Sequence, residues 1–179
     1  MKRLSEKTLW EGSSWRFRVE TLALSDGNKM ERGKIVHPGA VVLVPMLHIE
    51  KTPHIAMIRQ FRHVLNETIF ELPAGTRGWD EDWHVCAQRE LQEETGYRAA
   101  SFTKLGDIWP SPGVSDELMK LYLATGLQPD PLPADVDEEI EVVPMPLVDC
   151  IEMVQNGRIR DAKTIVGVWK TAVYLQHPL

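Results

Sequence analysis

The sequence contains only two cysteines, Cys86 and Cys150, which lie far apart in a chain of 179 residues. Neither belongs to a C-x-x-C pair and the six histidines show no H-E-x-x-H spacing, so neither a zinc site nor a disulfide framework is indicated. No run is long and apolar enough to cross a membrane, and the opening stretch MKRLSEKTLW lacks the apolar core of a signal peptide. We therefore expect a cytoplasmic protein with no membrane partner.

Positive charge is scarce as well. The chain has 20 Lys and Arg against 26 Asp and Glu, a net charge of −6, and it has no basic stripe. Binding to a nucleic-acid backbone is therefore not expected. With 43% hydrophobic and 26% charged residues and no internal repeats, residues 1–179 fit one globular domain with a substantial core.

The order of the expected elements favours an α+β fold. The run AVVLVPML at 40–47 is typical of a strand buried on both faces, and Gly96 is a natural left-handed stop for a helix over 81–95. Further strands are expected at 15–24, 54–63, 68–75, 101–110, 117–127 and 139–147, and further helices at 147–158 and 161–176. Because strands and helices do not alternate regularly, a mixed α+β sandwich is favoured over a doubly wound sheet.

The first expected helix carries an acidic group in the stretch RELQEETGY. Glu90, Glu93 and Glu94 lie on one helical face, and two carboxylates ~5 Å apart repel by roughly 3 kcal/mol at an effective dielectric of about 20. They form either a solvated surface or a cation site. Glutamines rather than basic residues flank them, and Gly75 can adopt backbone geometry closed to other residues and aim the Ala74 carbonyl at an ion. These features favour Mg²⁺ or Mn²⁺.

The same residues resemble the Nudix box, G-x5-E-x7-R-E-U-x-E-E-x-G-U, in which U is bulky and apolar. The matching residues are Gly75, Glu81, Arg89, Glu90, Leu91, Glu93, Glu94, Gly96 and Tyr97. A match at every defined position with fixed spacing is a specific signal. The resemblance to Nudix hydrolases implies an α/β/α sandwich around a mixed sheet, and hydrolysis of a nucleoside diphosphate linked to another group.

Roles for the box residues follow from this resemblance. The implied catalytic metal ligands are the carboxylates of Glu90, Glu93 and Glu94 and the carbonyl of Ala74. Two or more Mg²⁺ or Mn²⁺ ions are implied with them. Arg89 and Glu81 would pair to hold the motif, and an ordinary surface ion pair is the alternative.

Segments outside the box, among them IRQFRH, ELPAG and NGRIRDAKT, resemble the branch of ADP-ribose pyrophosphatases and nucleoside-diphosphate-sugar hydrolases. Pro112 stands where this branch has a marker proline. By resemblance, Arg59 and Arg62 would clamp phosphate oxygens. Glu71 would add a carboxylate near the metals, and Glu117 would lie near the sugar. A solvated strand end and a solvated loop acid are the alternatives for Arg62 and Glu117.

The branch also uses a glutamate on a mobile loop as catalytic base. The matching stretch is DVDEEIEVV, in which we take Glu138 as the base, with Glu139 and Glu141 as fallbacks. A solvated acidic loop is the alternative for each of them.

Residues 1–36 match the branch less well. There the segment forms an extension of strands that helps to build a homodimer, and its aromatic residues stack on the nucleobase. Trp10 and Trp15 are the candidates here, and a buried packing role is the alternative. Residues 37–179 would form the catalytic core.

These features predict Mg²⁺-dependent hydrolysis of the pyrophosphate bond of ADP-ribose or a related nucleoside diphosphate sugar, giving a nucleoside monophosphate and a sugar phosphate. One alternative is a Nudix-type glycosyl hydrolase of GDP-sugars that attacks the sugar carbon, but such enzymes depart from the standard box. Another is a sensing domain that binds a nucleotide sugar without hydrolysis. Such domains usually lose box glutamates, all of which are present here.

Overall fold

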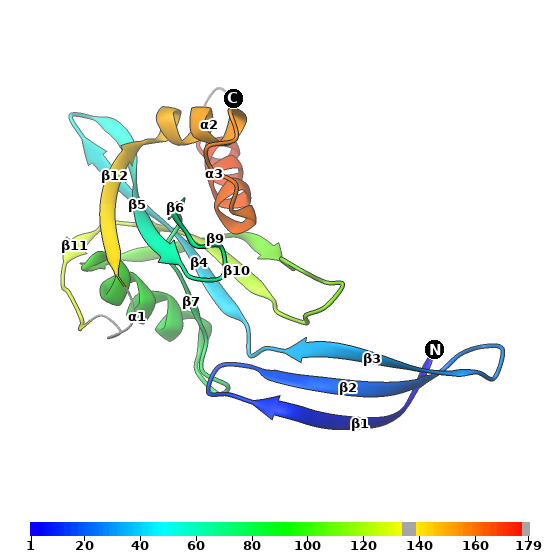
Figure 1. Cartoon of the computed structure of the whole chain (residues 1–179). Helices are drawn as coiled ribbons and strands as arrows, with labels where there is room; N and C mark the ends of the chain where they lie inside the picture. The colour runs from blue at the N-terminus through cyan, green and yellow to red at the C-terminus, as the bar shows by residue number, and fades with distance from the viewer. Residues whose placement is uncertain (134–138, 177–179) are drawn as a thin grey trace.

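A computed structural model describes residues 1–133 and 139–176 of the chain (Figure 1). Its strands are β1 Lys2–Glu11, β2 Arg16–Ala23, β3 Lys29–Val36, β4 Ala40–Ile49, β5 Thr52–Arg62, β6 Glu67–Glu71, β7 Ala74–Thr76, β8 Tyr97–Arg98, β9 Ser101–Ile108, β10 Met119–Thr125, β11 Gln128–Pro129 and β12 Ile140–Pro146. Its helices are α1 Trp83–Thr95, α2 Leu147–Gln155 and α3 Ala162–Tyr174. None of these three helices is both long and apolar enough to span a bilayer.

A seven-stranded mixed sheet forms the centre of the fold. Its strands run in the order β12-β5-β4-β10-β9, with β6 beside β5 and β7 beside β4. β4 and β10 are parallel, whereas the other pairs are antiparallel. Figure 1 shows α1 on one side of this sheet and α2 and α3 on the other, so the predicted α/β/α sandwich is confirmed.

β4 supplies both hydrophobic cores. Val42 and Val44 pack in the cluster that includes α2 and α3, while Val41 and Leu43 pack in the cluster that includes α1. All four side chains are fully buried. This is the alternation expected of a strand that is covered on both faces, so the prediction from the apolar run at 40–47 is confirmed.

α1 has a capping signal at each end. The Asp82 carboxylate accepts hydrogen bonds from His84 N (2.8 Å) and Val85 N (3.3 Å). The helix therefore begins at Trp83, two residues later than predicted. Gly96 ends the helix at a φ of 74°, and the predicted left-handed stop is confirmed.

β1 is a strand that the hydrophobic pattern alone did not predict. All ten of its residues are exposed, because it belongs to a separate sheet, β1-β2-β3, that projects from the body (Figure 1). We call this sheet the arm. Main-chain pairing holds it together, along with contacts from Glu6 to Arg3, Arg18 and Lys34.

The base of the arm is attached to two loops of the body. Ile35 N donates to the Val114 carbonyl (2.8 Å), and Asp116 N donates to the Ile35 carbonyl (3.2 Å). The Arg16 guanidinium lies 4.2 Å from the ring centroid of Trp79. The arm therefore contacts both the β9–β10 loop and the loop that leads into α1.

α3 packs so closely on the body that a side chain at Gly167 would not fit. A Cβ there would lie 2.3 Å from Cδ1 of the fully buried Leu72. We expect Gly167→Val to overpack this contact and to lower the free energy of unfolding by about 1–3 kcal/mol in denaturant titrations. Gly113→Val is the control, because a Cβ there meets nothing within 4 Å, and it should change that energy by less than about 0.5 kcal/mol. Equal losses in the two variants would argue against the close packing.

Candidate active site

The acidic face of α1 turns inward. Glu90 and Glu94, one helical turn apart, are only 8% and 5% exposed, and they are buried together with Leu91 and Ala87 of the same helix. Glu93 lies at the partly exposed edge of this face. Because buried carboxylates require compensating charge or hydrogen bonds, a solvated acidic surface is excluded for Glu90 and Glu94. Their role in a cation site stays a prediction.

The short strand β7 lies directly against these carboxylates. Ala74 N donates to Glu94 Oε2 at 2.9 Å. A Cβ added to Gly75 would lie 1.8 Å from Glu90 Cδ and 2.0 Å from its Oε2. Gly75 does not have a positive φ, so the predicted special backbone geometry is wrong. Glycine is required here because there is no room for a side chain.

Arg89 balances part of this negative charge. Its Nε lies 3.0 Å from Glu81 Oε1, and its Nη1 lies 2.7 Å from Glu90 Oε1 and 2.8 Å from Glu93 Oε2. The hydrogen bond from Arg89 lowers the pKa of Glu81, and the Glu81 carboxylate in turn raises the pKa of Arg89. The predicted pair is present. Glutamines flank the cluster, but Arg89, one turn before Glu93, is a basic partner within it.

The donor set suits a hard divalent cation. Among residues 1–133 and 139–176, no three acidic, His or Cys side chains form a ready-made metal cage. Glu90 and Glu93 contact Arg89, and Glu94 contacts a backbone amide. Mg²⁺, however, keeps several waters and binds through one or two carboxylates. The buried Glu90 and Glu94 meet that requirement, and Glu93 and the Ala74 carbonyl are further candidate donors.

A cleft of about 250 Å³ opens beside β7. Its lining consists of Ala40, Arg62, Ala74, Gly75, Thr76, Pro110, Glu117, Met119, Asp161, Ala162 and Lys163. Two predicted substrate contacts, Arg62 and Glu117, therefore meet beside the strand that borders the acidic face. Pro112, the predicted branch marker, lies in the exposed part of the β9–β10 loop, and Pro110 lines the cleft instead.

The wall of the cleft next to α3 carries a buried ion-pair group. Glu71 is 1% exposed, accepts hydrogen bonds from Arg62 Nε (2.6 Å) and Nη2 (2.8 Å), and also contacts Lys163 Nζ. Burial alone would raise the pKa of Glu71, but the two cations outweigh it and hold that pKa below its usual value. Glu71 is therefore an anion between two cations, and its place near a metal stays a prediction.

Lys163 and Asp161 also line the cleft, but the sequence analysis did not predict them as site residues. Asp161 caps α3, and its Oδ2 accepts hydrogen bonds from Thr164 N and from Lys163 Nζ, both at 3.0 Å. One pattern in the sequence predicts that Lys163 is buried. Lys163, Gly167 and Thr171 recur at a spacing of four residues, which puts Lys163 on the buried stripe of the helix.

Arg59 and Arg62 line different cavities. They are three residues apart on β5, so they lie on opposite faces of the strand. Arg59 Nη1 lies 2.8 Å from Glu141 Oε2, beside a shallow depression of about 500 Å³ that Glu139 also borders. Both fallback bases thus lie near Arg59, and the first choice, Glu138, lies outside the described residues.

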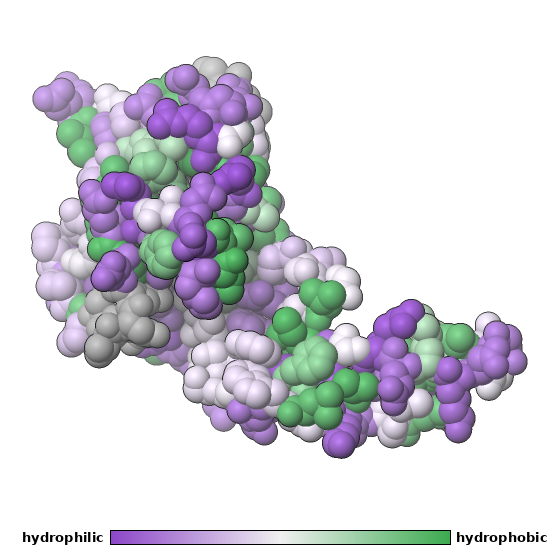
Figure 2. Space-filling view, in the orientation of Figure 1, coloured by the Kyte–Doolittle hydropathy of each residue, from purple (hydrophilic) through white to green (hydrophobic). Residues whose placement is uncertain are grey.

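Trp10 and Trp15 lie at the base of the arm, outside the lining of the cleft. Their ring centroids are 4.3 Å apart, and the residues are 49% and 38% exposed. Figure 2 shows other hydrophobic residues on the surface of the arm. The two rings therefore contact each other without being buried, and their role at a nucleobase stays a prediction.

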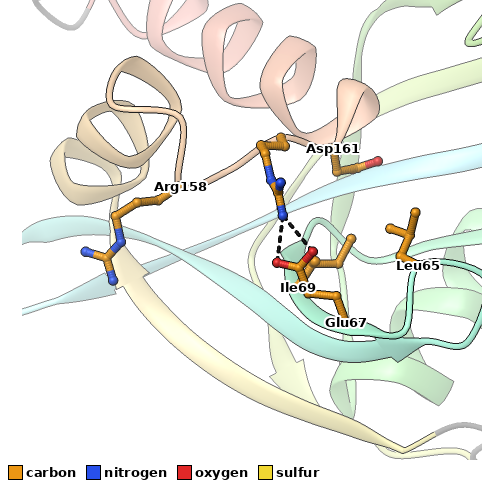
Figure 3. Close-up of a pocket in the computed structure, with 6 residues that line it drawn as sticks. Leu65, Glu67, Ile69, Arg158 and Asp161 are labelled. Carbon is orange, nitrogen blue, oxygen red and sulfur yellow. Dashed lines mark hydrogen bonds and ion pairs between the residues drawn. The ribbon is translucent and has the colours of Figure 1, made fainter.

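A neighbouring pocket of about 310 Å³ lies on the far side of Asp161. It is lined by Leu65, Glu67, Ile69, Arg158, Arg160 and Asp161. The Glu67 carboxylate accepts hydrogen bonds from Arg160 Nη2 on both oxygens at 2.6 Å, and Arg158 points away from it (Figure 3). No α1 carboxylate lines either cavity. The cleft, however, is lined by Ala74 and Gly75, which lie against Glu94 and Glu90, so we assign the site to the cleft beside β7.

We expect Gly75→Ala to displace the Glu90 carboxylate, because the added methyl group would overlap it. Displacing a ligand in this way should weaken Mn²⁺ binding at least ~10-fold in calorimetric titrations. Gly113→Ala, which adds a methyl group in open space, should leave the affinity unchanged. If Gly75→Ala is folded by circular dichroism and binds Mn²⁺ as tightly as the parent, Glu90 is not a metal ligand.

Comparison with known proteins agrees with this geometry. A sequence profile of the NUDIX domain matches residues 37–166. The chain is 36% identical over 175 residues to an ADP-ribose pyrophosphatase of Bacillus subtilis (strain 168), covering 94% of this chain and 93% of the relative. It is 32% identical to a methanol dehydrogenase activator of Bacillus methanolicus, covering 93% and 90%. It is 33% identical to a GDP-mannose pyrophosphatase of Cronobacter sakazakii (strain ATCC BAA-894), covering 81% and 80%.

A solved structure shares the fold. The crystal structure of an ADP compounds hydrolase superposes with a TM-score of 0.83, covering 98% of this chain and 94% of that chain at 20% identity. The profile match covers most of the chain, and the complete box surrounds the buried carboxylates of α1. The chain belongs to the Nudix family.

Proposed function

We propose that this chain hydrolyses the pyrophosphate bond of ADP-ribose or a related nucleoside diphosphate sugar, with Mg²⁺, to a nucleoside monophosphate and a sugar phosphate. The observation that carries the proposal is the burial of Glu90 against Gly75 and of Glu94 against Ala74, beside a cleft that Arg62 and Lys163 also line. Relatives named ADP-ribose pyrophosphatase and GDP-mannose pyrophosphatase support this substrate class.

Divalent ions would be held by the box. We propose two or more Mg²⁺ or Mn²⁺ ions with Glu90, Glu93, Glu94 and the Ala74 carbonyl as their ligands. When bound, the metal neutralises the diphosphate, lowers the pKa of a water molecule and stabilises charge on the leaving phosphate. Arg89 supports this by holding the carboxylates of Glu90 and Glu93 in place through its contacts with both.

The substrate contacts we propose lie on both sides of β5. Arg62 binds diphosphate oxygens in the cleft, because a guanidinium matches the geometry of phosphate, and Arg59 is a second phosphate contact from the neighbouring depression. Glu117 accepts a sugar hydroxyl in the cleft. Trp10 and Trp15 stack on the nucleobase.

The catalytic base we propose is Glu138, which takes a proton from the attacking water. Glu139 and Glu141 follow as candidates, because they border the depression next to Arg59. The contact between Arg59 and Glu141 at 2.8 Å favours Glu139 over Glu141, since the guanidinium already occupies one carboxylate oxygen of Glu141.

A substrate panel tests the reaction. We expect incubation with ADP-ribose, UDP-glucose and GDP-mannose to release a nucleoside monophosphate and a sugar phosphate with Mg²⁺ present, and nothing in excess EDTA. Release of a nucleoside diphosphate and free sugar would show attack at the sugar carbon instead. Tight binding of intact ADP-ribose with no products would show a sensing domain. Both outcomes would replace the proposal.

Glu94→Gln tests the metal ligands. We expect turnover to fall at least ~10²-fold, because a catalytic metal supplies much of the charge stabilisation in such reactions. The matched control is Glu152→Gln on the exposed face of α2, which should keep full turnover. Near-normal turnover of Glu94→Gln would remove Glu94 from the site.

We also propose a homodimer formed through the arm. Its exposed apolar residues include Leu4 at 47% and Leu9 at 54%, and such residues gathered on one element favour a protein contact. We expect Leu4→Glu/Leu9→Glu to convert a dimer into a monomer by light scattering. Lys29→Glu, at an exposed position on β3 of the same arm, should leave the mass unchanged. A monomeric parent protein would refute the proposal.

We further propose a cytoplasmic location, with no nucleic-acid or membrane partner. Cys86 and Cys150 are free and buried. Burial raises the pKa of each thiol to about 12, so both are unreactive at neutral pH. Free cysteines of this kind are typical of a reducing compartment.

A further inference from the structure

The α3 wall of the cleft holds a charged group that is buried more deeply than a surface ion pair. The side chains of Glu71 and Lys163 are 1% and 10% exposed, and they contact each other. Arg62 and Asp161 complete the group, with side chains 35% and 19% exposed. Two cations and two anions therefore balance inside one wall of the cleft.

A gain in folding stability does not explain why these four charges are placed together in the wall. Replacing a buried ion pair by packed apolar side chains is often neutral or stabilising, because the desolvation of the charges offsets their attraction. The wall already has apolar and hydroxyl contacts, such as the hydrogen bond from Leu72 N to Thr164 Oγ1 at 2.8 Å. The charges instead fix the orientation of the Glu71 carboxylate, since each of its two oxygens accepts a hydrogen bond from a cation.

The orientation of Arg62 depends on Glu71. The two parallel hydrogen bonds from Arg62 Nε and Nη2 fix the plane of the guanidinium. Glu71 Oε2 is shared between Arg62 and Lys163. Lys163 is in turn held by Asp161 at 3.0 Å. A chain of contacts thus runs from the first turn of α3 to an arginine that lines the cleft.

We propose that Lys163 is a positioning residue: it holds the carboxylate of Glu71, and through that carboxylate it sets the guanidinium of Arg62 at the diphosphate of the substrate. The inference rests on the proposed hydrolysis of a nucleoside diphosphate sugar. Without Lys163, the Glu71 carboxylate loses its second cation and turns, and Arg62 turns with it. The contacts of Lys163 run to Glu71 and Asp161, whereas the proposed metal ligands lie on α1 and β7.

A double-mutant cycle tests the inference. We expect Lys163→Met to lower kcat/KM at least ~10-fold and Arg62→Met to lower it further. The double variant should be no worse than Arg62→Met alone, within about threefold, because Lys163 acts only through Arg62. Lys163→Arg should restore part of the loss. Mn²⁺ affinity should stay that of the parent in all four variants.

Controls separate this role from folding. Lys170→Met, on the same helix but beside Gly106, should keep the parent kcat/KM. Melting temperatures identify variants that are unfolded at the assay temperature. If Lys163→Met is one of these, Glu71→Gln, which keeps the shape of the side chain, replaces it in the same cycle with Arg62→Met.

The outcomes are distinct. Losses that multiply in the double variant, or a parent-like kcat/KM in folded Lys163→Met, would overturn the inference and leave the proposed function standing. A parent protein that hydrolyses no nucleoside diphosphate sugar would instead overturn the proposed function itself. Loss of Mn²⁺ affinity in Lys163→Met would show that the lysine acts on the metal side, contrary to the inference.

Discussion

The close approach of the Gly75 backbone to the Glu90 carboxylate is the constraint on which the rest of the site depends. It lets α1 lie near enough to β7 for Ala74 N to reach Glu94 at 2.9 Å. The cap at Asp82 fixes where the helix begins. Ala87 and Leu91 pack against β4, and they turn the face that also carries Glu90 and Glu94 toward the sheet.

The cleft lies between two regions of different charge. On α1, which packs against β7, Arg89 is shared among several glutamates, so negative charge is in excess and a cation is favoured. Beside α3, Arg62 and Lys163 lie against acids in equal number. A diphosphate bound between these two regions would meet metal ions on one side and a guanidinium on the other. This division explains how a chain of net charge −6 can provide a site for a polyanion.

Sequence patterns predicted those features of the fold that depend on residues close together in the chain. The apolar run of β4 and the glycine stop of α1 could be read directly, because burial on two faces and a left-handed cap each have a short-range signature. The steric reason why residue 75 must be glycine could not be predicted from the sequence. It is a clash with the side chain of Glu90, which comes close only in the folded chain. The placement of Arg59 and Arg62 on opposite faces of β5 follows from the alternation of side chains along a strand. The pairing of Glu71 with Lys163 spans 92 residues and appears only in the folded chain.

β4 also determines how the molecule can open. Because its alternate side chains belong to both cores, neither helical layer can leave the sheet without uncovering a strand that the other layer still holds. We therefore expect the body to open as one cooperative unit, and the arm, with β1 exposed along its whole length, to open separately and at lower free energy. We therefore expect rigidity to be concentrated in the body, which holds Glu90, Glu94 and Arg62, and conformational freedom in the arm.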